Sequence, residues 1–206
     1  MIKIEPKQGT TIVKLSGGDW SLDFANTWWE WETSYTHLLE WSQRVGLVDE
    51  QQARIMAQKA ESSPDEQQDV LERAISLRTL IQSIFWALAH GQPANNDDLA
   101  RLNALLPHVL SKQRVIRDGD RFMWDWDEQD EGLDRMLWPV IHAAAELLMA
   151  PDLQWLKACQ GEECDRLFLD LSRNHSRRWC EMQHCGMLVK SRRHYAKKRL
   201  SRAKPA

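Results

Sequence analysis

Four cysteines confined to a short segment near the C-terminus constrain this chain more than any other feature of its sequence. They form two close pairs, Cys159-x4-Cys164 and Cys180-x4-Cys185, and fifteen residues separate the pairs. Each pair can offer two thiolates from one tight turn, and the residues between can form a hairpin that brings the pairs together. This spacing predicts one tetrahedral zinc site with four thiolate ligands.

Two disulfides or four unrelated thiols are the alternatives to a metal site. The N-terminus MIKIEPKQGTT lacks the charged-then-apolar leader of an exported protein, so we expect a cytoplasmic chain whose thiols stay reduced. The sequence also has no run of about 18 apolar residues, and we expect no association with a membrane. His175, His184 and His194 are alternative ligands, but an all-cysteine shell is the expected one.

A four-thiolate shell leaves no coordination position for a water nucleophile, so the zinc is expected to be structural. The sequence contains no GxxxxGK phosphate loop and no HExxH motif. Its carboxylate clusters around residues 30–32 and 125–127 are too generic to indicate catalysis. We therefore expect that the protein is not an enzyme.

Charge divides the chain more sharply than its net value of -3 suggests. Residues 1–155 hold 14 lysines and arginines against 25 acidic residues, whereas residues 156–206 hold 13 against 5. A basic end on an acidic body is typical of a chain whose one end meets a polyanion. A helix from about residue 186 to 202 would be basic, with a narrow apolar seam at Val189, Ala196 and Leu200.

The remaining sequence predicts a mainly α fold with a small β ribbon, an α+β class in which most elements are helices. Asp118-Gly119 predicts a hairpin turn, and residues 10–18 are a candidate partner strand. Helices are expected over 35–45, from a capping box at Ser63 to residue 90, from 99 to Pro107, and over 133–149. We place the boundary between a helical domain, 1–151, and the zinc finger, 152–206, at Pro151, with all core residues of the helical domain before it.

Two segments resemble one known bacterial architecture. Residues 159–186, CQGEECDRLFLDLSRNHSRRWCEMQHCG, resemble the CGNR zinc-finger family, whose members are predicted transcription regulators. LDFANT at residues 22–27 and YTHLLEWSQRVGL at residues 35–47 resemble the N-terminal helical domain of that family, called ABATE. Where the family pattern reads Cys-Gly-Asn-Arg, this chain has Met187 and Leu188 in place of the polar pair.

The resemblance implies a treble-clef-like zinc finger with a basic C-terminal helix, in which Cys159, Cys164, Cys180 and Cys185 bind zinc. It implies a surface for duplex DNA made by these basic residues: Arg173, Arg177, Arg178, Lys190, Arg192, Arg193, Lys197, Lys198 and Arg199. For Arg173 and its neighbours, a local turn is an equal alternative.

Asp23 and Asn26, in the N-terminal signature, are three residues apart and would share one helical face. Buried polar side chains need partners, so the two either tie this helix to a neighbouring loop, which we favour, or line a pocket for a small-molecule effector.

The leading hypothesis is therefore a transcription regulator whose zinc finger binds DNA and whose helical domain senses a small molecule or stress signal. A zinc-stabilised module that binds protein or RNA is the alternative. A homodimer is compatible with either function.

Overall fold

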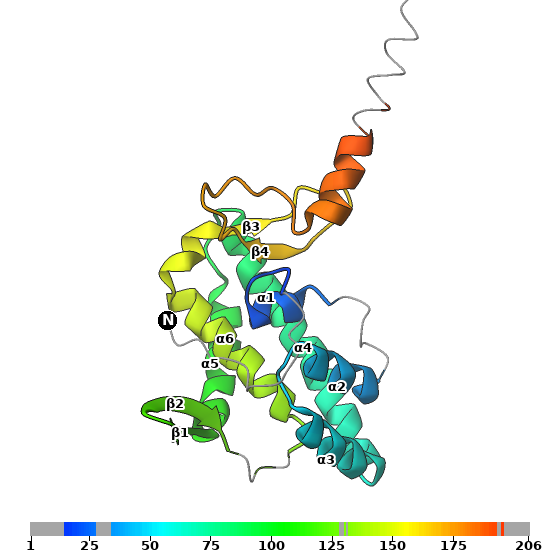
Figure 1. The fold of residues 1–206 in the computed structure, drawn as a ribbon, viewed down its shortest axis with the longest axis vertical. Coiled ribbons are helices and arrows are strands. Elements are labelled where there is room, and N and C mark those ends of the chain that lie inside the picture. Colours follow the sequence, from blue (N-terminus) through cyan, green and yellow to red (C-terminus); the bar gives the residue numbers. More distant parts are fainter. Residues whose placement is uncertain (1–14, 28–33, 128–129, 131, 193–194, 196–206) are drawn as a thin grey trace, which may run out of the picture.

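The computed structural model describes residues 15–27, 34–127, 130, 132–192 and 195. Within them, the fold is mainly helical with two small antiparallel sheets, which confirms the expected class (Figure 1). The helices are α1 (Trp20–Ala25), α2 (Tyr35–Arg44), α3 (Glu50–Glu61), α4 (Pro64–Ala89), α5 (Asn96–Ser111) and α6 (Trp138–Met149). The strands are β1 (Gln113–Asp118), β2 (Arg121–Trp126), β3 (Leu156–Ala158) and β4 (Leu167–Leu169). Short 3-10 segments are η1 (Arg135–Leu137) and η2 (Pro151–Trp155), and η3 (Met182–Gly186) is a π-helix.

The long helix α4 is the central element of the helical part. It begins with Pro64 at its first positions and buries apolar side chains at helical spacing along most of its length, among them Val70, Leu77 and Ile84. The capping box expected at Ser63 is wrong, because its side chain makes no capping hydrogen bond. Its backbone N–H bonds to Ala60 O at 3.1 Å, so the short connection from α3 holds Ser63 at a ψ of 63°, outside the extended geometry of an N-cap.

Helix α5 also departs from expectation, because it continues through Pro107 to Ser111. A proline inside a helix removes one backbone hydrogen bond. The turn that follows carries Val109, whose side chain is fully buried. We attribute the continuation to this packing, which offsets the lost bond.

The hairpin of β1 and β2 forms around the expected Asp118-Gly119 turn. Asp118 pairs with Arg121, and Gly119 has a φ of 59°, a conformation that glycine adopts without steric cost. In the described part of the chain this sheet has two strands. Residues 10–14 of the candidate partner strand lie outside the described residues, and residues 15–18 do not form a strand, so that part of the prediction is wrong.

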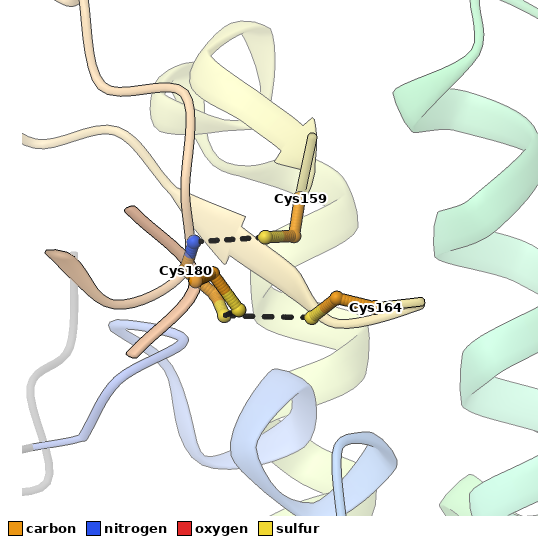
Figure 2. Close-up of side chains that lie close together, drawn as sticks. Cys159, Cys164 and Cys180 are labelled. Carbon is orange, nitrogen blue, oxygen red and sulfur yellow. Dashed lines mark hydrogen bonds between the residues drawn. The ribbon is translucent and has the colours of Figure 1, made fainter. Parts of the chain in front are cut away.

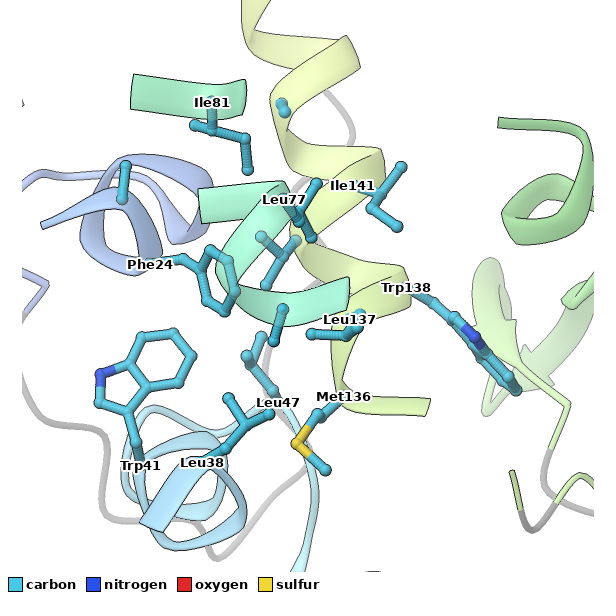
Figure 3. Packing of buried hydrophobic residues seen from close by; sticks show 14 of the residues in the cluster. Phe24, Leu38, Trp41, Leu47, Leu77, Ile81, Met136, Leu137, Trp138 and Ile141 are labelled. Atoms are coloured by element: carbon cyan, nitrogen blue, oxygen red, sulfur yellow. The ribbon is translucent and has the colours of Figure 1, made fainter. Parts of the chain in front are cut away.

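One hydrophobic core joins the helices to the first part of the finger. It includes Phe24 and Trp41, whose rings meet edge to face at 5.5 Å, and residues of α4 and α6 (Figure 3). The same core includes Leu156, Leu167 and Leu169 from β3 and β4. The expectation that every core residue precedes residue 151 is therefore wrong. The functional division at that residue stays a prediction.

Polar contacts reinforce this junction. The side chain of Asn26, which is 5% exposed, donates to Leu167 O at 2.9 Å and accepts from Leu167 N at 2.8 Å. Its amide therefore makes the two hydrogen bonds that the backbone of a neighbouring strand would make. The side chain of Gln82, on α4, donates to Asp165 O at 3.0 Å. Figure 1 shows β3 and β4 beside the C-terminal end of α4 and next to α1.

We expect Asn26→Ala to lower the free energy of unfolding by about 3 kcal/mol, because it leaves a buried N–H and a buried C=O of Leu167 without partners. Urea unfolding monitored by far-UV circular dichroism measures this change. Asn103→Ala, on the exposed face of α5, is the matched control and should change stability little. Equal stability of the two variants would contradict the role given to Asn26.

Candidate metal centre and nucleic-acid surface

The structure brings the four cysteine sulfurs together in the finger. Cys159 follows β3, Cys164 lies in the connection to β4, Cys180 ends the loop after β4 and Cys185 lies in η3. All four Sγ atoms lie within 4.8 Å of one another. The Sγ of Cys180 is 3.7 Å from that of Cys164 (Figure 2) and 3.7 Å from that of Cys185. Two pairs that are distant in sequence thus form one site.

These separations fit tetrahedral zinc. Ligands at a Zn–S distance of about 2.3 Å stand about 3.8 Å apart at the corners of a tetrahedron. A disulfide would hold two sulfurs at about 2 Å, and all four cysteines are free thiols. The four cysteines therefore fit one zinc ion held by four thiolates, which would crosslink the two halves of the finger.

The four thiols influence one another's pKa values. A hydrogen bond from the Cys180 thiol, opposed by burial, lowers the pKa of Cys159 to about 5, and the Cys180 backbone N–H also donates to that sulfur at 3.3 Å. The same hydrogen bond to Cys159 raises the pKa of Cys180, while burial raises the pKa of Cys185 to about 12. One thiolate thus disfavours ionisation of its neighbours, and a bound cation allows all four to ionise.

Glycine at position 161 permits the close approach of the two pairs. A Cβ at Gly161 would lie 3.1 Å from the Cβ of Cys164 and 3.4 Å from the Sγ of Cys185. A Cβ at Gly186 would collide with the sulfur of Met182 and lie 3.4 Å from the Trp179 ring. The Met182 side chain is exposed and can move away, so the steric argument for glycine holds at position 161.

The alternative histidine ligands lie elsewhere, as far as they are described. The ring of His175 stacks on Trp155 at 3.5 Å between centroids, and its Nδ1 lies 2.6 Å from Asp170 O. His184 is exposed. His194 lies outside the described residues. The metal-binding cluster found among the described residues consists of the four cysteines.

An ion pair that sequence reasoning missed organises the loop between β4 and Cys180. Asp170 is fully buried and accepts hydrogen bonds from Lys157 Nζ at 2.6 Å and from Arg177 N at 2.8 Å, and both the N–H and the hydroxyl of Ser172 donate to it as well. The Lys157 ammonium also donates to His175 O at 2.6 Å. Burial alone would raise the pKa of Asp170, but the hydrogen bonds from Lys157, Ser172 and Arg177 outweigh it and hold the pKa well below its ordinary value.

Arg177, expected on the nucleic-acid surface, makes structural contacts within the finger. Its half-buried guanidinium donates to Trp179 O and Ser16 O, both at 2.9 Å, and to Cys180 O. It also lies over the Phe168 ring, 4.4 Å from the centroid. These contacts of Nε and Nη2 bind the N-terminal loop to the finger. A role of Arg177 in binding phosphate stays a prediction.

Other basic residues of the predicted surface are exposed. Arg173 stands in the loop after β4, and Arg178 donates to Gln160 Oε1 at 2.7 Å while remaining exposed. Residues 187–192 and 195 are helical; in this segment Lys190 is exposed and Arg192 pairs with Glu162. The remaining predicted contacts lie outside the described residues: Arg193, Lys197, Lys198 and Arg199.

The start of this helical segment exposes apolar side chains where the CGNR pattern has a polar pair. Met187 is 61% exposed and Leu188 is 48% exposed, so neither joins the seam. Val189 is buried, as the seam predicts. Ala196 and Leu200 lie outside the described residues.

The side chains of Asp23 and Asn26 form hydrogen bonds to neighbouring backbone. Asp23 accepts hydrogen bonds from the backbone N–H groups of Ser16 and Gly17, both at 3.0 Å, and from the Ser16 hydroxyl at 3.1 Å. With Asn26 bonded to Leu167, both side chains hold neighbouring backbone, which is the interpretation we favoured. The groove found on the helical part is lined by other residues.

Comparison with known families gives two matches that together span most of the chain. Residues 18–151 match the ABATE model, described as "Putative stress-induced transcription regulator", and residues 155–198 match the CGNR zinc finger. A search of curated proteins gave no match. No helix among the described residues combines the length and apolarity that a membrane span requires.

We expect about one zinc per chain in protein purified without added metal, because the four sulfurs form one closed shell. Elemental analysis together with titration of accessible thiols measures it. Cys180→Ser should reduce the zinc content and unfold the finger. A folded, metal-free protein with four titratable thiols would rule the site out.

We expect Asp170→Asn to lower the free energy of unfolding by roughly 3 kcal/mol at neutral pH, because Lys157 loses a buried, charged partner. Since the pKa of Asp170 is depressed in the folded state, its contribution is present above the ordinary value of 3.8 and is lost as pH falls below it. The difference between wild type and variant should therefore shrink in acid.

Thermal unfolding from pH 7 to pH 3 provides this comparison. Asp165→Asn is the matched control, because the Asp165 side chain is exposed in the same finger. If Asp170→Asn and Asp165→Asn were equally stable at neutral pH, the ion pair would not organise the loop.

Proposed function

Because the chain belongs to the ABATE family and carries a CGNR zinc finger, we propose that it is a bacterial transcription regulator that binds duplex DNA through the finger. The zinc is structural in this function: it fixes the loop and the helical segment that meet DNA. The closed four-thiolate shell favours a binding protein over an enzyme. A regulator of this kind acts in the cytoplasm, where cysteine thiols remain reduced.

This proposal is carried by one observation: the basic residues of the finger fall into two groups, one engaged inside the protein and one exposed to solvent. Lys157 and Arg177 are engaged inside the finger by Asp170 and by backbone carbonyls. Arg173, Arg178 and Lys190 instead present exposed charges. A finger that needed cations only for its own stability would not require this second, outward-facing set. Exposed cations of this kind bind phosphates by releasing condensed counterions.

Arg192 belongs to the same basic surface, although it forms an ion pair with Glu162. Its ion pair with Glu162 joins two exposed side chains, 51% and 63% accessible, and pairs of this kind contribute at most about 1 kcal/mol. A phosphate can therefore displace Glu162 at little cost. The sequence beyond this residue continues with basic side chains up to Arg202.

Base recognition is expected to be weak. Met187 and Leu188 are exposed at the start of the helical segment, where polar side chains would be placed to reach base edges. Neither can form a bidentate hydrogen bond to a base. Phosphate contacts should therefore dominate, with modest sequence preference.

A protein-binding or RNA-binding role for the finger is the second candidate. Met187, Leu188 and Tyr195 are at least 48% exposed on the described part of the helical segment, which gives it an apolar side as well as a basic one. Exposed apolar groups of this kind are typical of contacts with protein. A homodimer is compatible with either candidate.

We expect DNA affinity to fall steeply with salt, because about four to six neutralised phosphates give a slope of log K against log salt of about -4 to -5. Fluorescence anisotropy with labelled duplexes of different sequence measures it. Replacing Lys197 and Lys198 by alanine should weaken binding to all sequences and flatten the slope by about two units.

The matched control replaces Arg117 and Arg121, two exposed cations of the hairpin, by alanine. This variant carries the same change in net charge and should bind DNA as the wild type does. Salt-independent affinity, or no binding to DNA by the zinc-loaded protein, would refute DNA binding. Binding to single-stranded RNA in preference to duplex DNA would favour the second candidate.

A further inference from the structure

A groove of about 460 Å³ lies between helices α4, α5 and α6, away from the zinc site. Its floor is apolar and buried, and it is made by Leu77, Leu80, Val109, Leu137, Trp138 and Ile141. Its rim includes exposed residues of α4 and α5, among them Arg73, Ala104 and His108. Figure 3 shows Trp138 and Ile141 on the side of α6 that faces away from Phe24 and Trp41. A volume of several hundred Å³ with an apolar floor suits a small organic molecule.

The polar groups of the rim determine which head group fits. Asp134 is the carboxylate that lines the groove, and its side chain is only 15% exposed. It already accepts from Arg73 Nη2 at 2.6 Å, and its Oδ2 lies 3.4 Å from His108 Nε2. A cationic ligand would have to displace Arg73 to reach this carboxylate, so the groove disfavours cations.

Arg101 is the rim cation that is least committed to other contacts. Its guanidinium is half exposed and makes two long contacts, to Asp98 Oδ1 and to Ser76 Oγ, each 3.3 Å. Both are weaker than a charge-assisted hydrogen bond of ordinary length, about 2.8 Å. A ligand carboxylate can therefore replace them with a closer, bidentate pair.

We propose that this groove binds a small carboxylic acid with an apolar body, which packs on the leucines and Trp138 while its carboxylate pairs with Arg101. The groove is then the effector site of the proposed regulator. Only this regulatory role rests on the proposed function. Binding itself is independent of DNA. The floor residues Leu77 and Leu80 belong to α4, which also contacts the finger through Gln82 and Asp165. A ligand in the groove thus packs on the helix that holds the finger.

The test uses three probes with one ring system and three head groups: 1-naphthoate, 1-naphthalenemethanol and 1-naphthylmethylammonium. Isothermal titration calorimetry of the full, zinc-loaded chain measures each affinity. We expect saturable binding of naphthoate, about tenfold weaker binding of the alcohol, and weaker binding still of the ammonium.

Two variants separate the head group from the body. Arg101→Gln should weaken naphthoate about tenfold and leave the alcohol unchanged, because it removes the charge and keeps the apolar floor. Ala104→Trp should abolish binding of both, because an indole on the exposed rim would fill the groove without entering the core. Arg117→Gln, on the hairpin, is the matched control and should bind as the wild type does. Thermal unfolding establishes that each variant is folded.

No saturable binding of naphthoate at millimolar concentration would overturn this site. So would equal affinity for the three probes, or naphthoate binding that survives both Arg101→Gln and Ala104→Trp. An absence of DNA binding in the salt titration would not change the calorimetric results for the groove. Each proposal can therefore be refuted independently of the other.

Discussion

Four thiolates can occupy one small volume only if a cation lies among them, and the finger depends on this condition. The sulfurs of Cys159, Cys164, Cys180 and Cys185 lie within 4.8 Å of one another, and burial and neighbouring thiols oppose the ionisation of Cys180 and Cys185. The finger has few apolar residues of its own, with Phe168 and Trp179 packed against the cysteines. Zinc therefore replaces much of the core that a segment this short cannot build.

The finger is also attached to the helices through polar contacts that converge on one loop. Ser16 and Gly17 bond to Asp23 of α1, while Ser16 O accepts from Arg177 and Gly17 O accepts from Leu169 N at 2.8 Å. Together with Asn26 and the shared core, this loop seats β4 against α1. The basic surface is thus held by the helical part, so a change in the packing of those helices can reach it.

The sequence was sufficient for features with a strong periodic or spacing signal. The cysteine pairs, the hairpin turn at Gly119 and the apolar stripe of α4 each follow from local rules, and the structure has all three. The Asp170 ion pair has a weak signal, a single aspartate after an apolar run, because its partner Lys157 is distant in sequence. The structural contacts of Arg177 were missed for the same reason: an arginine in a basic segment looks like its neighbours until its acceptors are known. The end of α5 was misplaced because the burial of Val109 overrides the local effect of Pro107.

X-ray absorption at the zinc edge tests the central claim most directly, because it reports the atoms bound to the metal in the folded protein. Our interpretation predicts a first shell of four sulfur atoms at about 2.3 Å, with no nitrogen or oxygen neighbour. A shell containing nitrogen or oxygen at about 2.0 Å would contradict it, since a histidine or a water would then complete the site.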